Sequence, residues 1–387
     1  MRPLRQLVPA RFRRADGEQP PPAVIYLVSA AGHPSFGDEL ITRAWLDVLT
    51  ELRPEAEVWL DCPYPGRASH LFRRTHPGLH VTSTLWELAA SCPSPADPIA
   101  DAERVARFVR DLGTPRIDPG LLALRGVANV HILGGGLFAA AGVESLGIIS
   151  AVAELQRAFG IPASVTGLCL PPMDRELSTW VTGELDVFDV VEARDRVTAE
   201  AVGGELGLDD AFLALAVGRR VYDESTAPEH VVLVQGDART WTDGDAIRSI
   251  ESFFGDTPHE VAAFVEATPP DDARYIADTA PEARFYSFGN IWFDGLPARA
   301  GQRWLTTRFH AHLLAAAAGA MGTVIIDADG ADDRTHSSLL DLGTGWNAIR
   351  AGEQAAPAAD PDFPARAREH AATKRALAVA MYARVDD

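Results

Sequence analysis

The chain has 387 residues, of which 47% are hydrophobic and 23% are charged, and its formal net charge is −19. This length and composition predict a globular protein of two domains, and the acidic charge excludes a general nucleic-acid-binding protein, which would carry a basic stripe. No apolar run approaches the roughly 18 residues of a transmembrane helix. The three cysteines form neither a paired framework nor a metal-ligand spacing, so we expect a reduced, cytoplasmic protein.

Residues 1–22 are expected to form a flexible basic tail, because five arginines fall within residues 1–14 and three prolines follow at 20–22. No long apolar segment accompanies the arginines, so they do not indicate a signal peptide. A weak peripheral contact with an anionic membrane surface is the alternative interpretation of this tail.

Strand and helix patterns alternate through the first half of the chain. Residues 23–30, AVIYLVSA, form a continuous apolar run that is typical of a buried parallel strand. Residues 38–52 then place apolar side chains on one face of a helix. The same reasoning predicts further strands at 57–60, 127–133, 163–168 and 186–193, and further helices at 101–112, 145–159 and 194–206.

The second half repeats this alternation, beginning with a predicted strand at 230–235, HVVLVQ. The other predicted strands are 261–266, 284–288, 303–307 and 323–327, and the predicted helices are 245–254, 271–279 and 309–320. After Gly330 the pattern is looser, until a final helix is expected within residues 365–387.

This alternation predicts an α/β protein with two Rossmann-like domains, residues 23–222 and 229–350, each built on a parallel sheet covered by helices. The final helix, within 365–387, is expected to pack back on the first domain. Ligands of such folds bind at the carboxyl ends of the strands, so we expect the active site in the cleft between the domains. The sequence does not indicate an oligomeric state.

The most informative segment is Thr307-Arg308-Phe309-His310, where a predicted strand meets an alanine-rich helix. A helix N-terminus presents unpaired N–H groups and a partial positive charge. Arg308 adds a planar donor fork suited to phosphate or carboxylate, and His310 can exchange a proton near neutral pH. Together they predict an anion-binding site with a proton-transfer group beside it. An ordinary strand-to-helix turn with a surface arginine is the alternative.

Two glycine-containing loops also follow predicted strands. In the first, Gly37 can adopt backbone shapes closed to other residues, and Asp38 either caps the next helix or orients a substrate. In the second, Gly134, Gly135 and Gly136 let a ligand approach the backbone and expose N–H groups toward an anion. This triplet lacks the spacing of a dinucleotide-binding or P-loop motif, and a tight turn is its alternative role.

Arginines follow two further strands. Arg194 is expected to point from the end of a strand into the cleft, while Asp195 and Thr198 start the next helix. A surface ion pair of little energetic value is the alternative role for this segment. Arg239, after the first strand of the second domain, is a weaker candidate for substrate binding. The histidines lack metal-site spacing, so neither a metal nor a cofactor is expected.

In order and spacing, these segments resemble the motifs of polysaccharide pyruvyl transferases, which contain a GD, a GGG turn, an RD followed by Ser or Thr, and an RxH before a helix. The resemblance covers roughly residues 23–327. The matching segments are Gly37-Asp38, Gly134-Gly135-Gly136, Arg194-Asp195 with Thr198, and Arg308-Phe309-His310. The resemblance implies a GT-B-like architecture with the acceptor on the first domain and the donor on the second.

The resemblance further implies transfer of the enolpyruvyl group of phosphoenolpyruvate onto two sugar hydroxyls, forming a cyclic ketal on a polysaccharide or glycolipid. Arg308 and His310 match the arginine and histidine of the family's donor site, and Arg194 matches the strand-end arginine. His310 suits a general acid or base, and two arginines suit a donor with both a carboxylate and a phosphate. Thr307 is expected to contact the substrate.

Two other functions stay open. A GT-B-like glycosyltransferase would bind a nucleotide sugar and would need an aromatic platform and a carboxylate, for which Trp292, Trp346 and Asp341 are the candidates. A non-catalytic binding protein of the same fold is favoured by the acidic loop 327–333, which has four aspartates and no lysine.

Overall fold

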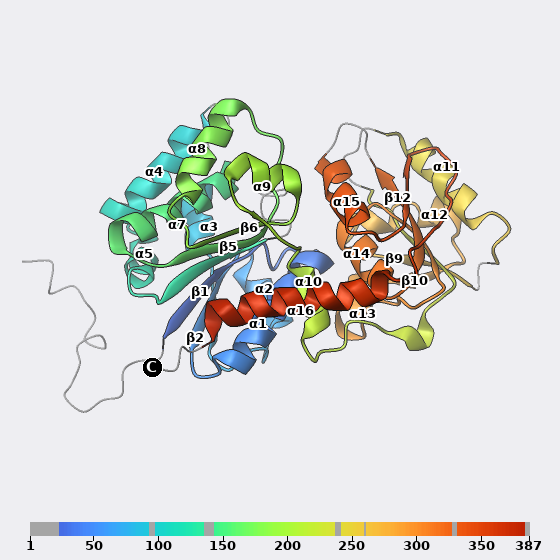
Figure 1. The fold of residues 1–387 in the computed structure, drawn as a ribbon, viewed down its shortest axis with the longest axis horizontal. Coiled ribbons are helices and arrows are strands. Elements are labelled where there is room, and N and C mark those ends of the chain that lie inside the picture. The colour runs from blue at the N-terminus through green and yellow to red at the C-terminus, as the bar shows by residue number, and fades with distance from the viewer. Residues whose placement is uncertain are drawn as a thin grey trace, which may run out of the picture.

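The computed structural model describes residues 23–92, 97–134, 143–236, 241–258, 261–326 and 331–383. They form two α/β domains that lie side by side, and the last helix runs along both (Figure 1). The two Rossmann-like domains predicted from the sequence are therefore confirmed. The tail predicted at 1–22 lies outside these residues. Among the helices within these ranges, none combines the length and the apolar character that a membrane crossing requires.

The sheet of the first domain has seven parallel strands in the order β3-β2-β1-β4-β5-β6-β7. Its central strands are mostly apolar and largely buried because helices cover both faces of the sheet. The strands are β1 (Val24–Val28), β2 (Glu57–Asp61), β3 (Leu79–Thr82), β4 (Asn129–Leu133), β5 (Ala163–Leu168), β6 (Val190–Ala193) and β7 (Glu205–Leu206). The helices are α1 (Phe36–Leu52), α2 (Pro65–Leu71), α3 (Thr84–Ala90), α4 (Pro98–Asp111), α5 (Asp118–Leu124), α7 (Val143–Phe159), α8 (Arg175–Leu185), α9 (Arg196–Val202) and α10 (Ala211–Ala216).

The second domain has a six-stranded parallel sheet in the order β10-β9-β8-β11-β12-β13. Its strands are β8 (His230–Leu233), β9 (Ala262–Val265), β10 (Arg284–Tyr286), β11 (Arg303–Thr306), β12 (Met321–Ile326) and β13 (Asn347–Arg350). The helices are α11 (Asp243–Phe254), α12 (Ile276–Thr279), α13 (Phe288–Phe293), α14 (Phe309–Ala317), α15 (Ala331–Asp341) and α16 (Phe363–Tyr382), with 3₁₀ turns at Glu224–Thr226 and Asp271–Ala273.

In each sheet the order in which strands are added along the chain reverses once. The reversal lies between β1 and β4 in the first domain and between β8 and β11 in the second. In a parallel α/β sheet such a reversal leaves a crevice at the carboxyl ends of the two strands, where ligands bind. Four of the candidate loops follow these four strands: Gly37 follows β1, the glycine triplet β4, Gln235 β8, and Arg308 β11.

Three parts of the prediction differ from the structure: two predicted helices and the region after Gly330. The helix predicted at 194–206 ends at Val202, because Gly203 takes the left-handed conformation that terminates a helix, and the chain then forms β7. The helix predicted at 271–279 is split into a 3₁₀ turn and α12. Asp272 explains the split, since its side chain bonds the backbone of Ala267 and Thr268, outside any helix.

The third difference lies after Gly330, where the sequence pattern is too weak to predict α15 and β13. α15 packs on α14, and β13 adds an edge strand beside β12. β13 alternates poorly between apolar and polar residues because it is an exposed edge strand, so its sequence pattern is weak.

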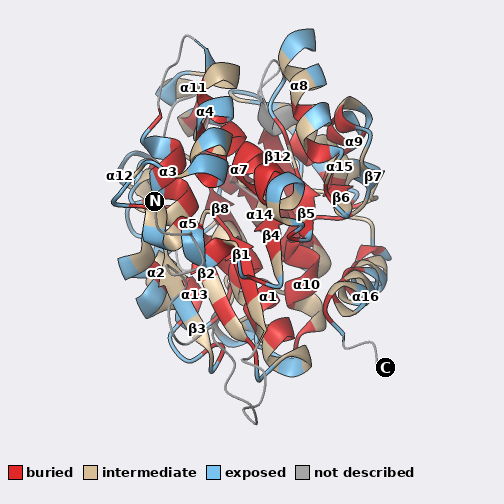
Figure 2. Ribbon diagram, turned by 90° about the vertical axis from the view of Figure 1, so that its left-hand side faces the viewer, coloured by how far each residue is buried: buried red, intermediate tan, exposed pale blue. Residues whose placement is uncertain are grey.

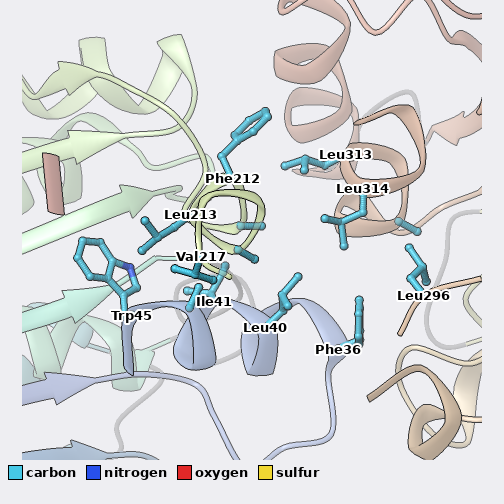
Figure 3. Packing of buried hydrophobic residues seen from close by; sticks show 14 of the residues in the cluster. Phe36, Leu40, Ile41, Trp45, Phe212, Leu213, Val217, Leu296, Leu313 and Leu314 are labelled. Carbon is cyan, nitrogen blue, oxygen red and sulfur yellow. The ribbon is translucent and has the colours of Figure 1, made fainter. Parts of the chain in front are cut away.

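The largest apolar core joins the two domains. Figure 3 shows Leu40 and Trp45 of α1 and Leu213 of α10 on one side, with Leu313 and Leu314 of α14 facing them from the second domain. Burying one such side chain contributes about 1.5–3 kcal/mol, so this shared core holds the domains in one arrangement. α16 lies on the outside of the molecule (Figure 2) and packs along α10, α14 and α1.

Candidate active site

A cavity of about 430 Å³ lies between the two domains, where strands of both sheets end. The loops after β1, β5 and β6 line it from the first domain, and the loops after β8, β9 and β11 line it from the second. It brings together six residues singled out by the sequence analysis: Gly37, Asp38, Arg194, Thr307, Arg308 and His310.

His310 lies in the first turn of α14 and faces the first domain. α14 starts directly after β11 because Arg308, its N-cap, still has extended backbone. The imidazole packs so closely on the first turn of α1 that a Cβ at Gly37 would lie 1.8 Å from Nδ1. Only a residue without a side chain leaves room for the ring, so Gly37 serves the site by admitting His310.

A buried carboxylate, Asp209, binds Arg194 and faces His310. Arg194 Nη1 donates to Asp209 Oδ2 at 2.8 Å, and His310 Nε2 lies 3.4 Å from Oδ1. Burial alone would raise the pKa of Asp209, but the imidazole and then the guanidinium lower it well below its ordinary value. Asp209 is therefore ionised at neutral pH, and it orients one group from each domain.

Arg194 is buried on the wall of the cavity. Its guanidinium carbon lies 4.3 Å from the ring centroid of Phe309, and its Nε has no hydrogen-bond partner within the described part of the chain. A buried N–H group without an acceptor costs free energy, so this arrangement favours a ligand that accepts hydrogen bonds. The surface ion pair considered as an alternative is wrong, because both Arg194 and Asp209 are buried. Asp195 caps α9 through the backbone N–H of Thr198, as predicted.

Arg308 pairs with an internal carboxylate that the sequence does not indicate. Its Nε and Nη2 donate to Asp272 Oδ1 at 3.0 and 2.8 Å. Burial raises the pKa of Asp272, although the guanidinium opposes that shift. Among the described residues none accepts a hydrogen bond from Nη1, which leaves one edge of the guanidinium for a ligand.

Thr307 and Asp38 also lie on the cavity wall. The Thr307 hydroxyl accepts from the backbone N–H of Gln235 at 2.9 Å, so it joins the ends of β8 and β11. Asp38 does not cap α1, because the N-cap is Ser35 and Asp38 falls in the first turn. The capping role considered for Asp38 is therefore wrong.

Gly134, the residue of the glycine triplet that the structure describes, contributes differently from the prediction. Gly134 is absent from the cavity wall, and a Cβ there would lie 2.3 Å from the carbonyl oxygen of Gly167. A glycine is needed at position 134 because the ends of β4 and β5 pack closely there. Gly135, Gly136 and Arg239 lie outside the described residues.

Sequence reasoning missed Asp209, Asp272 and Arg334. Asp209 precedes Asp210 and an apolar helix, a pattern that indicates only a helix start. Arg334 lines the cavity from α15, and its Nη2 donates across the domain boundary to the Leu170 carbonyl at 3.2 Å. The partners of these residues are distant in sequence, so no local spacing could identify them.

A second cavity of about 500 Å³ adjoins the first on the first domain, and His33 and Asp38 line both. Its other walls include Tyr64, whose side chain is half exposed, and Trp86 and Glu87 of α3. The His33 and Tyr64 rings lie 5.8 Å apart, between centroids. Aromatic faces beside carboxylates suit a ligand with both apolar faces and hydroxyl groups.

No protein-family model matches the sequence, and a search of curated proteins finds no match. Solved structures of similar fold do exist. A Listeria monocytogenes protein assigned as a UDP-N-acetylglucosamine 2-epimerase matches with a TM-score of 0.53 at 12% identity, over 94% of this chain and 92% of that one. The S. aureus MnaA–UDP co-structure matches with a TM-score of 0.50 at 10% identity, over 92% and 88%. At these identities the likeness shows the fold alone, which is the two-domain GT-B-like architecture.

The contact between Gly37 and His310 predicts that Gly37→Ala displaces the imidazole. Because the new methyl group would overlap the ring, we expect a loss of about 1–3 kcal/mol in the free energy of unfolding. Gly66→Ala is the control, since a Cβ there meets nothing within 4 Å. Urea denaturation of both variants measures the difference, and equal stabilities would contradict the observed contact.

Glu39, next to Asp38, is a buried carboxyl group behind the cavity. Its Oε1 accepts from the backbone N–H of Gly32 at 2.8 Å, and its Oε2 has no hydrogen-bond partner in the described ranges. Burial raises its pKa to about 8. Glu39 is therefore largely protonated at neutral pH in the folded protein.

This raised pKa predicts a pH-dependent stability. Between the ordinary glutamate value of 4.5 and about 8, the folded state binds a proton that the unfolded state has lost. The free energy of unfolding therefore falls as pH rises, by up to about 1.4 kcal/mol per pH unit from this group. In Glu39→Gln this contribution is absent, so the wild-type protein should lose stability relative to the variant between pH 5 and 8. If the free energies of unfolding of the two proteins changed equally with pH across that range, the raised pKa of Glu39 would be contradicted.

Proposed function

We propose that this chain transfers the enolpyruvyl group of phosphoenolpyruvate onto two hydroxyls of a sugar, which produces a cyclic ketal. The observation that carries the proposal is one cavity at the switch points of both domains, where His310 faces the buried Arg194–Asp209 pair and Arg308 stands beside it. The resemblance to pyruvyl transferase motifs supports the same reaction, because its matched positions Gly37, Arg194, Arg308 and His310 lie together here.

The cavity wall is suited to a donor with two anionic groups. Three arginines line it, Arg194, Arg308 and Arg334, in a chain whose net charge is −19. An acidic protein that binds an anion must gather its cations locally. The N-terminus of α14 adds backbone N–H groups, and no side chain caps it. These groups would hold the carboxylate and the phosphate of phosphoenolpyruvate.

The reaction then needs one proton transfer to carbon. Protonated His310 gives its proton to the methylene carbon, an acceptor hydroxyl adds to the neighbouring carbon, and the proton of that hydroxyl returns to the imidazole. The carbon–oxygen bond to phosphate then breaks, and inorganic phosphate leaves with the bonding electron pair. A second hydroxyl adds to the same carbon and closes the ketal, and its proton goes to the departing phosphate. The arginines stabilise the leaving phosphate, and ionised Asp209 keeps the imidazole in place.

The second cavity supplies a place for the sugar acceptor. It opens beside the first and shares Asp38 with it, so a hydroxyl in the second cavity would lie near the donor. Tyr64 offers an exposed aromatic face to a sugar ring, and Asp38 and Glu87 offer carboxylate oxygens to its hydroxyls.

Transfer of a sugar from a nucleotide sugar is the second candidate, and the fold comparison favours it, since one of the fold neighbours is a co-structure with UDP. The aromatic residues suggested for base stacking do not support it. Trp292 is buried under Arg43, and Trp346 is buried and donates its Nε1–H to the Ala320 carbonyl at 3.0 Å. Neither lines the cavity.

Binding of phosphoenolpyruvate, measured by calorimetry, tests the proposed donor. Arg308→Gln should weaken binding about 10- to 100-fold, because it removes a charge-assisted hydrogen bond. Asp272→Asn should not weaken binding, since it frees the guanidinium from its internal partner. Arg303→Ala is the matched control, because Arg303 lies exposed at the opposite end of β11. A wild-type protein that binds UDP but not phosphoenolpyruvate would instead support the second candidate.

Replacing His310 tests catalysis separately from binding. His310→Ala should lower turnover about 10²–10⁴-fold, as expected for the loss of a general acid, and should leave phosphoenolpyruvate affinity nearly unchanged. Release of inorganic phosphate in the presence of a sugar acceptor measures turnover. A wild-type protein that binds phosphoenolpyruvate with no turnover on any acceptor would point to the non-catalytic binding protein.

A further inference from the structure

The chain contains a single lysine, Lys374, and it is buried. It lies in α16, on the stripe of buried residues that packs this helix against the rest of the protein. Its ammonium contacts the carboxylates of Glu192 and Asp210, the latter at 2.6 Å, and donates to the Leu208 carbonyl at 2.9 Å. A buried ammonium is costly unless such partners compensate it. Every other position that carries a cation in this chain, the histidines aside, uses arginine.

The three partners of Lys374 flank both members of the Arg194–Asp209 pair. Glu192 precedes Arg194 by two residues at the end of β6. Leu208 and Asp210 stand on either side of Asp209 along the chain. The lysine thus bonds to both segments that carry the ion pair, although it does not itself line the cavity.

Asp210 extends the connection to other elements of the first domain. Its Oδ2 accepts from Trp45 Nε1 at 2.9 Å and from the Thr166 hydroxyl at 2.8 Å, and the Gly134 N–H lies 3.4 Å away. Trp45 belongs to α1, the helix whose first turn contacts His310. A change in the position of Asp210 would therefore move several elements that support the site.

We infer that Lys374 is a positioning residue: from the C-terminal helix, it fixes the segments that carry Arg194 and Asp209, and so aims Asp209 at Arg194 and His310. It touches no substrate. The inference rests on the proposed function only where catalysis is measured, because the geometry of the Arg194–Asp209 pair can be tested without a ligand. It gives α16 a role in the site that packing alone does not require.

The test uses a charge-balanced variant, Lys374→Met with Glu192→Gln, which removes one positive and one negative charge from the buried cluster. This design keeps the net charge of the buried cluster unchanged, and the Asp210 carboxylate keeps its hydrogen bonds from Trp45, Thr166 and Gly134. The control is Arg375→Met, which removes the neighbouring α16 cation that pairs with Glu51 at the surface.

The first measurement needs no ligand. Asp209→Asn is introduced into the wild-type protein, the balanced variant and the control, and each Tm is measured. If Lys374 aims Asp209, Asp209→Asn should lower Tm clearly less in the balanced variant than in the wild-type protein, because the effects of coupled sites are not additive. In the Arg375→Met control, Asp209→Asn should lower Tm as much as it does in the wild-type protein. Additive effects in all three backgrounds would overturn the inference. If the balanced variant does not fold, Lys374→Arg replaces it in the same cycle with a smaller shrinkage expected, and fully additive effects there would overturn the inference.

The second measurement follows turnover of the folded variants with phosphoenolpyruvate and a sugar acceptor. The balanced variant should lose about 10- to 100-fold in kcat, as small misplacements of catalytic groups do, and Lys374→Arg should recover part of the loss. Wild-type kcat in the folded balanced variant would overturn the inference. A wild-type protein without turnover would refute the proposed function, and the Tm cycle would then decide the role of Lys374 alone.

Discussion

The candidate site depends on one buried carboxylate. Asp209 binds Arg194 from the first domain and faces His310 from the second, so the two halves of the site meet at a single charge. An ionised carboxylate in the interior is stable only with such partners. The apolar core between α1, α10 and α14 makes this arrangement possible, because it holds the domains in one position.

The arginines on the cavity wall are brought together by folding. The chain is strongly acidic, yet the arginines of the cavity wall come from the loops after β6 and β11 and from α15, which are far apart in sequence. Two of the three are paired with buried aspartates, Arg194 with Asp209 and Arg308 with Asp272. An anionic ligand would then be bound by the edges of the guanidinium groups that internal partners leave open, which favours small ligands with defined geometry.

The fold comparison concerns the arrangement of the domains, whereas the resemblance to pyruvyl transferases concerns the residues in the cleft. The fold is similar to that of a protein assigned as a UDP-N-acetylglucosamine 2-epimerase and of a protein solved with UDP, and it shows how the domains are arranged, while a reaction depends on the groups placed in the cleft. His310 beside Asp209, with arginines around it, is the arrangement on which the proposed transfer from phosphoenolpyruvate rests. The buried positions of Trp292 and Trp346 leave a nucleotide base without the platform that the sequence suggested.

The sequence by itself determined the fold class, because a buried parallel strand must be apolar along its length and a covering helix must repeat its apolar residues every three to four positions. It also singled out Arg194, Arg308 and His310, since strand ends are where such folds bind ligands. Only the tertiary structure decided which partners these residues have. Asp209 and Lys374 carry no local signal, because their roles depend on segments brought together by folding across long sequence distances.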